Sequence, residues 1–322
     1  MFSRIEGTGH YAPERVLTNA DLEKIVDTTD EWIRSRTGIE RRHIAAENET
    51  TADLAEHAAL AAMEAAGVGP DDVDFLIVGT TTPDLVFPNV GCLLQDRLGI
   101  NGTPAFSVEA ACSGFIYALS VADKFIRCGE SNCALVIGAE TLSRIVDWND
   151  RSTCVLFGDG AGAVVLRPAD EAGIISTHLQ ADGRYKDVLT AESGVSVQLP
   201  GDALREGFNV RMSGNEVFKV AVKSLESIAD KALSHNNMQR SDLDWLIPHQ
   251  ANMRIIQATA KRLGVPMEKV ILTLQEYGNT SAASVPMALD IAVREGKIKR
   301  GDLLLLEAFG GGLTWGSALV RF

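Results

Sequence analysis

Short apolar runs alternate with longer helical patterns along this chain. Continuous apolar runs at 75–78, 133–137 and 303–306 are typical of strands that are buried on both faces. Residues 51–66 are rich in alanine, with apolar positions at helical spacing, and Gly67 follows where such a helix would end. Strands that alternate with long helices predict a parallel-rich sheet covered by helices.

The pattern also repeats. Segments of the first half recur in the second half in the same order: 72–79 in 242–249, 97–100 in 262–265, and 157–160 in 309–312. The first pair gives an offset of 242 − 72 = 170 residues. We therefore expect two similar βα halves, 1–172 and 173–322, packed as layers.

Residues 181–209 differ from the rest of the chain. The segment is polar, contains several glycines and shows little periodicity. A long loop in a compact domain is often a lid or a binding loop. An uninvolved surface excursion explains the pattern equally well.

The charge of the chain limits its partners. Its 322 residues carry a net charge of −13, with a pI near 5.0. An acidic surface argues against nucleic acid and against anionic membranes. An acidic protein partner would therefore need a local basic patch.

The compartment is expected to be the cytoplasm. No apolar run approaches the roughly 20 residues that span a bilayer, and residues 1–7 lack the apolar core of a signal peptide. The five cysteines show no metal-site spacing, so we expect free thiols.

Cys112 is a candidate nucleophile. Residues 105–108 can form a strand, and from Cys112 to Ile126 apolar residues recur at helical spacing. A cysteine near a helix N-terminus is favoured as thiolate, its nucleophilic form. A buried structural cysteine is an equally good interpretation of this segment alone.

His249 and Asn279 are candidates of a different kind. His249 ends an apolar strand, where sites in α/β proteins assemble, although a lone histidine is more often structural. Asn279 follows a glycine and would normally be a turn residue. Its distance from Cys112, 279 − 112 = 167, suggests that the two occupy equivalent places in the two halves.

The glycines at 310–312 follow the apolar run 303–306. Successive glycines let a backbone approach a ligand closely and direct N–H groups at it. A tight turn between strands would need glycine as well.

Together these segments resemble the ketoacyl-acyl-carrier-protein synthase III family, the initiating condensing enzymes of type II fatty-acid synthesis. The resemblance runs essentially from end to end and rests on stretches in the family's order: 30–33 (Asp-Glu-Trp-Ile), 36–39 (Arg-Thr-Gly-Ile), 111–115 (Ala-Cys-Ser-Gly-Phe), 156–163 (Leu-Phe-Gly-Asp-Gly-Ala-Gly-Ala), 248–252 (Pro-His-Gln-Ala-Asn), 278–281 (Gly-Asn-Thr-Ser) and 309–317 (Phe-Gly-Gly-Gly-Leu-Thr-Trp-Gly-Ser). It implies an α/β thiolase-like fold, layered α-β-α-β-α, with the halves related by a pseudo-twofold axis.

The resemblance implies a role for each candidate. Cys112 would take the acyl group of an acyl-CoA primer, acetyl-CoA by this family's pattern, with an oxyanion hole formed by the N–H groups of Cys112 and Gly311. The resemblance implies no metal and no redox cofactor, because the malonyl carboxylate supplies the carbanion. Malonyl-acyl-carrier protein would then lose CO₂ while His249 and Asn279 hydrogen-bond to its thioester oxygen. Phe157 would shape the malonyl site.

The resemblance also implies binding residues. Trp32, Arg36, Arg151 and Thr28 match positions that hold coenzyme A, although Trp32 could instead be a half-buried helix anchor. Phe87 matches a position that reaches into the acyl pocket of the partner in a homodimer. A large ring there would favour short primers.

The expected docking patch for the carrier protein lies on one helix. Arg254, Lys261 and Arg262 are spaced to share one helix face, and Lys219 could join them. The resemblance assigns Arg254 to docking. A solvated charged face is the alternative for the other three.

Two other functions fit parts of the pattern. A related condensing enzyme of secondary metabolism, using other primers or malonyl-CoA, would carry the same Cys-His-Asn set. A redox-sensing protein would need a reactive Cys112 but neither His249 nor Asn279.

Overall fold

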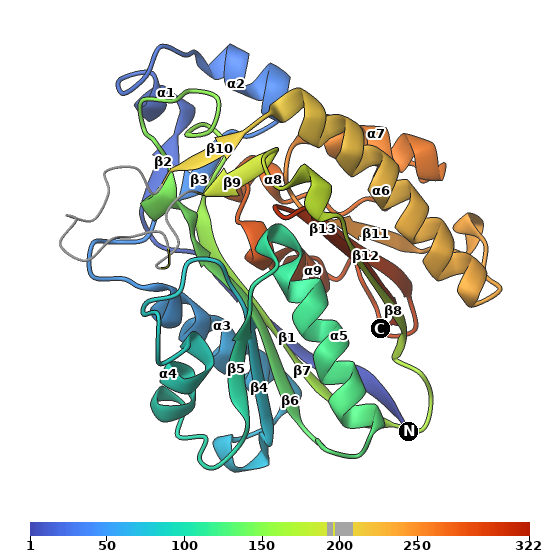
Figure 1. Ribbon diagram of the computed structural model, residues 1–322. Helices are drawn as coiled ribbons and strands as arrows, with labels where there is room; N and C mark the ends of the chain where they lie inside the picture. Colours follow the sequence, from blue (N-terminus) through green and yellow to red (C-terminus); the bar gives the residue numbers. More distant parts are fainter. Residues whose placement is uncertain (192–195, 197–208) are drawn as a thin grey trace.

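Two sheets form the centre of the computed structural model, which describes residues 1–191, 196 and 209–322 (Figure 1). The first sheet has the strand order β1 (Phe2–Tyr11), β7 (Asp159–Ala169), β6 (Ala134–Thr141), β4 (Phe75–Gly79), β5 (Ala105–Val108). The second has the order β8 (Ile174–Ala181), β13 (Thr314–Arg321), β12 (Leu303–Gly310), β11 (Trp245–Pro248).

The two orders correspond strand by strand. Both sheets contain a matching parallel pair, β4 with β6 and β11 with β12, and the next two strands along each sheet pair antiparallel. A parallel bridge between Leu246 and Val270 stands where β5 stands in the first sheet. This agreement supports a division into halves at residues 172 and 173, which stays a proposal.

The prediction of parallel-rich sheets is wrong, since both sheets are mixed. The connection between β12 and β13 is only three residues long, 311–313. A connection that short can join antiparallel strands but not parallel ones, which need a crossover of about a dozen residues.

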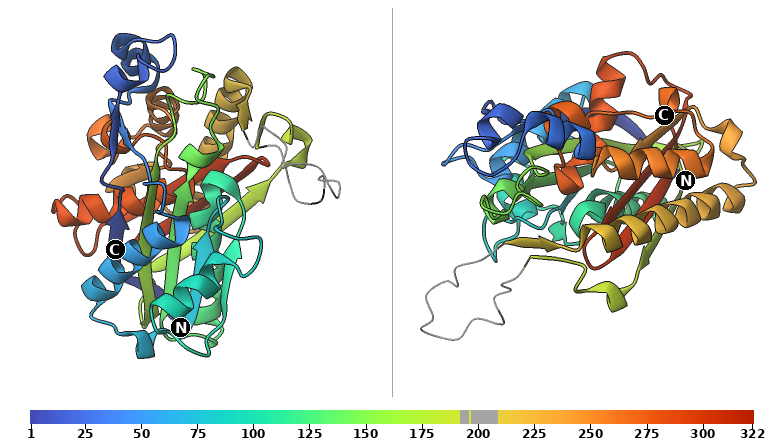
Figure 2. Two further views of the ribbon diagram at one scale, coloured as in Figure 1. Left: turned by 90° about the vertical axis from the view of Figure 1, so that its left-hand side faces the viewer. Right: turned by 90° about the horizontal axis from the view of Figure 1, so that it is seen from above.

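Helices cover every face of the two sheets (Figures 1 and 2). α5 (Gly114–Arg127) and α9 (Ser284–Arg294) lie between the sheets and pack on both. The outer faces are covered by four helices: α3 (Thr51–Ala66) and α4 (Val90–Arg97) on the first sheet, α6 (Gly214–His235) and α7 (Met253–Leu263) on the second. The layered α-β-α-β-α thiolase-like fold is thereby confirmed.

Strand β4 illustrates why its apolar run is continuous. Phe75 and Ile77 point to the central helices, whereas Leu76 and Val78 point to α3. All four side chains are fully buried. Successive side chains alternate between faces, so a strand covered on both sides needs apolar residues at every position.

The predicted helix at 51–66 is confirmed as α3. Thr50 and Asp53 form a reciprocal capping box at its start, and Gly67 ends it at a φ of 64°. That left-handed conformation is open to glycine at little cost, which explains why the helix stops there.

Smaller elements surround the upper end of the sheets in Figure 1. They are β2 (Val16–Thr18), α1 (Asn19–Leu22), α2 (Asp30–Thr37), β3 (Arg41–His43), β9 (Leu189–Ala191), β10 (Val210–Met212) and α8 (Leu274–Tyr277). β9 and β10 pair at the base of the segment 181–209. The remainder of that segment, 192–195 and 197–208, lies outside the described residues, so its predicted role as a lid stays untested.

Membrane spans were sought only in the described ranges, 1–191, 196 and 209–322. No helix there is long and apolar enough to cross a bilayer. The expected cytoplasmic location stays a prediction.

Candidate active site

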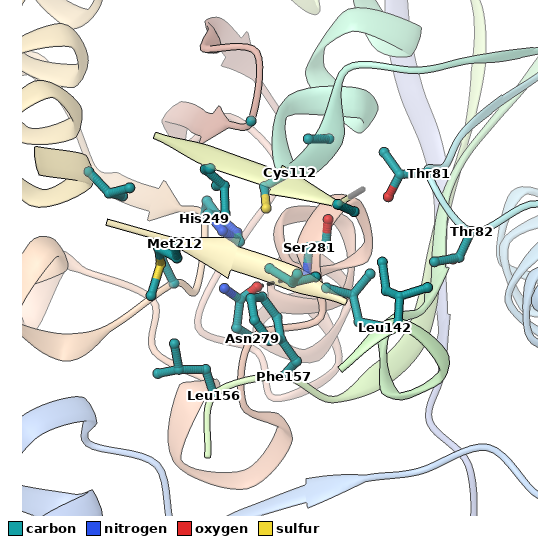
Figure 3. Close-up of a pocket in the computed structure, with 18 of the residues that line it drawn as sticks. Thr81, Thr82, Cys112, Leu142, Leu156, Phe157, Met212, His249, Asn279 and Ser281 are labelled. Carbon is teal, nitrogen blue, oxygen red and sulfur yellow. Dashed lines mark hydrogen bonds between the residues drawn. The ribbon is translucent and has the colours of Figure 1, made fainter. Parts of the chain in front are cut away.

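A cavity of about 1270 Å³ brings the candidate residues together. Its lining includes Trp32 and Arg36 of α2 as well as Cys112, His249 and Asn279. In Figure 3 the last three side chains converge on one space from separate segments. The sequence-predicted catalytic set is therefore assembled in one place.

Cys112 stands where the sequence placed it, between a strand and a helix. β5 ends at Val108, a 3-10 turn spans Ala111–Ser113, and α5 begins at Gly114. The N-terminus of α5 favours an anion at this place. Burial of the thiol acts in the opposite direction and raises the pKa of Cys112 to about 12, while hydrogen bonding by Ser281 lowers it. Burial dominates, so the resting thiol is protonated and the thiolate forms during attack.

The equivalence expected between Cys112 and Asn279 is wrong by three residues. A second 3-10 turn, Ser281–Ala283, precedes α9 as the turn Ala111–Ser113 precedes the 14-residue α5, and the two turns contact each other. Ala111 and Ser281 share an unusual positive φ, 45° and 52°. The offset is therefore 281 − 111 = 170, and the counterpart of Cys112 is Ala282.

His249 continues the pairing of β11 with β12, because its N–H donates to the carbonyl of Glu307 at 2.8 Å. Its Nδ1 lies 2.6 Å from the Ser284 hydroxyl. Burial lowers the pKa of His249 to about 3. The ring is therefore neutral at physiological pH and acts through one N–H and one lone pair.

The neighbouring Gln250 fixes the backbone around His249. Its amide nitrogen donates to the carbonyls of Pro248 and Ile271, and its amide oxygen accepts from the N–H groups of Thr273 and Leu274. Only 1% of the Gln250 surface is exposed, so its amide group depends on these hydrogen bonds within the protein. This rigid support sets the direction of the histidine ring.

Asn279 is held by its own backbone and side chain. Its N–H donates to Leu156 at 2.9 Å and its carbonyl accepts from Gly158 at 3.0 Å, a parallel bridge that places Phe157 alongside. Its Oδ1 accepts the N–H of Ser281 at 2.9 Å. Because an N–H needs an acceptor, the amide oxygen is committed and the amide nitrogen is left as a donor to the cavity.

Gly310 brings the glycine segment against the nucleophile. A Cβ at this position would lie 2.6 Å from the backbone nitrogen of Cys112, too close for any side chain. Gly311 follows and lines the cavity. The segment is thus both the turn between β12 and β13 and a wall of the site. The turn between strands is confirmed, and the approach of these N–H groups to a ligand stays a prediction.

The predicted coenzyme A residues gather around one indole. The guanidinium carbons of Arg36 and Arg151 lie 4.9 and 5.1 Å from the centre of the Trp32 ring. Arg151 also donates to the carbonyl of Asp27. The Thr28 hydroxyl is buried and has no hydrogen-bond partner in the described residues. Trp32 and Arg36 line the cavity, whereas Arg151 and Thr28 are not among its lining residues.

The predicted docking residues do not all remain available. Arg254 is exposed at the cavity edge, and Lys219 and Lys261 are exposed with no ion pair among the described residues. Arg262 is engaged with Glu226 at 2.5 Å. Three of the four charges are therefore free to meet a partner.

Phe87 stands away from the cavity of its own chain. Its side chain is 84% exposed, next to Val86 at 72% and Leu85 at 49%. Leu85 and Val86 line the cavity edge but Phe87 does not. An exposed apolar loop of this kind is typical of an interaction surface.

Sequence reasoning missed the residues that support the site. Ser281 donates to Glu140 at 3.1 Å, and Glu140 also accepts from Thr81 and Thr82. Ser284 contacts His249. The available signal was the polar stretch after Asn279, because serines at a predicted helix start are candidates for partners as well as caps.

Two carboxyl groups are buried behind the site without a cation. Glu140 is surrounded by hydroxyl and N–H donors, and burial still raises its pKa to about 7. The Glu307 oxygens have no hydrogen-bond partner in the described residues, and burial raises its pKa to about 8. Both groups therefore hold a proton in the folded protein at pH values where the unfolded chain has lost it.

This difference predicts that the contribution of the two carboxyl groups to stability is lost as pH rises from about 4.5, up to about 7 for Glu140 and about 8 for Glu307. A raised carboxyl pKa means that the folded state binds more protons in this window, so the free energy of unfolding falls by about 1.4 kcal/mol per pH unit for each group. Glu307→Gln should remove its share of the slope. Urea unfolding at several pH values measures it, with the exposed Glu64→Gln as control. An unchanged slope in Glu307→Gln would show that the carboxyl is ionised.

Metal binding was tested among the same described residues. No three His, Cys, Asp or Glu side chains there are placed to hold a metal ion. All five cysteines are free thiols. The expectation that no metal and no cofactor takes part stays a prediction.

Comparison with known proteins gives one family. The chain matches the family descriptions 3-Oxoacyl-[acyl-carrier-protein (ACP)] synthase III over residues 106–183 and 3-Oxoacyl-[acyl-carrier-protein (ACP)] synthase III C terminal over residues 233–322. It is 64% identical to the beta-ketoacyl-[acyl-carrier-protein] synthase III of Xanthomonas campestris pv. campestris, covering 100% of this chain and 99% of the relative.

Solved structures agree. The 3-oxoacyl-[acyl-carrier-protein] synthase III of Aquifex aeolicus VF5 superposes with a TM-score of 0.93 at 50% identity, covering 99% of this chain and 100% of the other. The priming beta-ketosynthase of the R1128 polyketide pathway gives 0.94 at 37% identity, covering 99% and 96%.

Proposed function

The chain belongs to the beta-ketoacyl-[acyl-carrier-protein] synthase III family of condensing acyltransferases, and we propose that it works through a thioester on Cys112. The reaction joins an acyl-CoA primer to malonyl-acyl-carrier protein and starts fatty-acid synthesis. The observation that supports this site is the convergence of Cys112, His249 and Asn279 at the base of one cavity. Acetyl-CoA is the proposed primer.

The first half-reaction is an acyl transfer. The Cys112 sulfur attacks the thioester carbonyl of the primer, and the N–H groups of Cys112 and Gly311 stabilise the oxyanion that forms. The bond to the coenzyme A sulfur then breaks, and the leaving thiolate takes up the proton that Cys112 gave away. The close approach of Gly310 to the Cys112 nitrogen supports this pairing of backbone donors.

The second half-reaction is a decarboxylating condensation. Malonyl-acyl-carrier protein loses CO₂, and the electrons of the broken bond form an enolate whose oxygen carries the charge. His249 and Asn279 each direct one N–H toward the cavity and stabilise that oxygen. The enolate carbon attacks the acyl-Cys112 carbonyl, and 3-ketoacyl-carrier protein leaves as the Cys112 thiolate is regenerated. Phe157, next to Asn279, borders the malonyl group.

The part of the cavity around Trp32 suits the nucleotide of coenzyme A. The flat Trp32 ring and the guanidinium groups of Arg36 and Arg151 offer stacking faces and positive charge. The unpartnered Thr28 hydroxyl is a further donor near them. These groups would hold the adenine and phosphates while the thioester reaches Cys112.

Arg254, Lys219 and Lys261 form the proposed docking surface for an acidic carrier protein, with Arg262 at its edge. We expect Arg254→Glu to raise the KM for malonyl-carrier protein by roughly 10-fold, since it reverses one contact charge at the cavity edge. Acylation by acetyl-CoA should be unchanged. The control is Lys299→Glu. Lys299 is exposed and precedes the start of β12, at the end of that strand away from Gly310 and the cavity. An equal rise of KM in both variants would place docking elsewhere.

We further propose that the enzyme is a cytoplasmic homodimer in which Phe87 enters the partner's acyl pocket. The exposed Leu85, Val86 and Phe87 support an interface at this loop. A phenyl ring that fills part of the pocket would favour short primers such as acetyl.

A condensing role in secondary metabolism is the second candidate. The similarity to the R1128 priming beta-ketosynthase supports it, although the identity of 37% is well below the 64% to the Xanthomonas synthase III. Activity with malonyl-CoA but not with malonyl-carrier protein would favour this alternative.

Intact-protein mass spectrometry tests the proposal directly. Mixing with acetyl-CoA should give one acetyl adduct, and adding malonyl-carrier protein should remove it and yield 3-ketoacyl-carrier protein. Longer and branched acyl-CoA primers rank the pocket's preference. The absence of an adduct with every primer would refute the Cys112 thioester.

A further inference from the structure

The hydroxyl of Ser284 is the partner of the catalytic histidine. We propose that Ser284 is a positioning residue that holds His249 with its single proton on Nε2, directed into the cavity. The inference rests on the function proposed above, in which His249 donates a hydrogen bond to the malonyl thioester oxygen. The observation that carries it is the contact of 2.6 Å between the Ser284 hydroxyl and His249 Nδ1.

Ser284 reaches His249 from a separate part of the fold. It is the first residue of α9, whereas His249 follows β11, 35 residues earlier in the chain. Only 2% of Ser284 is exposed. The Ser284 oxygen also accepts the N–H of Gln250 at 3.3 Å. The hydroxyl is therefore enclosed between these two groups.

These two contacts decide which ring nitrogen carries the proton. The Ser284 oxygen already accepts from Gln250, and its own hydrogen has no other acceptor than His249 Nδ1 in the described part of the chain. If Nδ1 carried the proton, both the Nδ1–H and the Gln250 N–H would donate to the Ser284 oxygen, and the buried hydroxyl hydrogen would be left without a partner, which is costly. The hydroxyl therefore donates to Nδ1, and the proton sits on Nε2.

The surroundings also exclude the doubly protonated ring. The N-terminus of the 11-residue helix α9 disfavours a positive charge beside it. Burial lowers the pKa of His249 far below neutrality, to about 3. The ring keeps a single proton, so its placement determines what His249 presents to the substrate.

The tautomer matters for one half-reaction only. As CO₂ leaves, negative charge builds on the thioester oxygen, and Nε2–H stabilises it without giving up the proton. The other tautomer would present a lone pair to that oxygen and repel it. Acyl transfer to Cys112 uses the backbone N–H groups and does not depend on the His249 proton.

Nuclear magnetic resonance of the unmodified enzyme is the first test. The chain has only six histidines, so labelling histidine with ¹⁵N gives a readable set of imidazole signals, and His249→Gln assigns one of them. We expect His249 to show a protonated Nε2 and an unprotonated, hydrogen-bonded Nδ1, unchanged between pH 6 and 8. A proton on Nδ1 would overturn the proposal.

Variants provide the second test. Ser284→Ala should lower kcat for condensation by about 10- to 100-fold, the scale seen when partners that orient site histidines are removed. The KM for malonyl-carrier protein and the rate of acylation should stay close to those of the unmodified enzyme. Ser284→Thr, which keeps the hydroxyl, should restore most of the loss and the Nε2–H signal. Ser3→Ala is the matched control, because it removes a buried serine hydroxyl bonded to Asp123 in another part of the fold.

The two half-reactions separate this inference from the proposed function. Full turnover in Ser284→Ala would refute the role of Ser284 and leave the Cys112 thioester intact. If the unmodified enzyme acquired no acyl group from acetyl-CoA, the proposed function itself would be refuted. Equal losses in Ser284→Ala and Ser3→Ala would reduce Ser284 to a structural role and overturn the inference.

Discussion

Cys112→Ala is expected to abolish acyl transfer and condensation. No acyl adduct should form with any acyl-CoA, and 3-ketoacyl-carrier protein should fall below about 10⁻³ of the unmodified level, because the variant lacks the sulfur proposed to carry the acyl group. Alanine is smaller than cysteine and apolar, so the buried position, 8% exposed, should accept it. Intact-protein mass spectrometry and product formation measure both losses.

The same variant should keep one partial reaction. Malonyl decarboxylation depends on His249 and Asn279, neither of which is hydrogen-bonded to the Cys112 side chain. We therefore expect Cys112→Ala to release CO₂ from malonyl-carrier protein without making ketoacyl product.

Cys128→Ala is the control for Cys112→Ala. Cys128 is an exposed free thiol. Its replacement should leave the acyl adduct and the ketoacyl product unchanged, because exposure alone does not make a thiol the acyl acceptor. An adduct that survives in Cys112→Ala would assign the acyl group to another residue.

Much of the fold could be predicted from local patterns. The apolar runs at 75–78, 133–137 and 303–306 coincide with β4, β6 and β12, and the alanine-rich segment became α3. Strand β12 continues to Gly310, beyond the predicted run. The apolar run stops before Glu307, whose carboxyl group is of a type rarely buried without a partner, and its burial and protonation depend on the layers packed around it.

Parts of the site could not be predicted, since they depend on contacts between distant segments. The repeat predicts that the two halves meet at Cys112 and Asn279, but the offsets between repeated segments range from 309 − 157 = 152 to 242 − 72 = 170 residues. The shared positive φ of Ala111 and Ser281 fixes the correspondence, and no sequence pattern encodes it. Ser284 likewise carries no signature of its own. Its role arises because α9 begins beside the end of β11.

His249→Ala and Asn279→Ala are expected to separate the two half-reactions. Each variant should acquire the acyl group at nearly the unmodified rate, because Cys112 and the backbone donors are untouched. Each should lower the rate of malonyl decarboxylation by roughly 10²- to 10³-fold, the usual effect of removing one hydrogen-bond donor from a developing oxyanion. Burst acylation followed by mass spectrometry and CO₂ release with malonyl-carrier protein measure the two steps independently.

The double variant, His249→Ala with Asn279→Ala, should lower the rate of malonyl decarboxylation by less than the product of the two single fold-losses. Both donors stabilise the same enolate oxygen, so once one is absent the other no longer completes the site. Asn279→Asp gives the shape-matched comparison: it keeps the size of the side chain but offers the enolate a second acceptor, and it should be at least as impaired as Asn279→Ala. If His249→Ala failed to acquire the acyl group, His249 would belong to the first half-reaction.

The pH dependence of malonyl decarboxylation tests the role of neutral His249 in the second half-reaction without any variant. An ordinary histidine loses its proton near pH 6.5, and a mechanism that needed imidazolium would slow as pH rises through that value. Burial lowers the pKa of His249 to about 3, so the ring is already neutral and still carries its Nε2 proton throughout the range from pH 5 to 8. We therefore expect the rate of malonyl decarboxylation in acyl-free enzyme to show no histidine titration in that range. A decline centred near pH 6.5 would instead require a charged His249 and would contradict the neutral donor on which the second half-reaction depends.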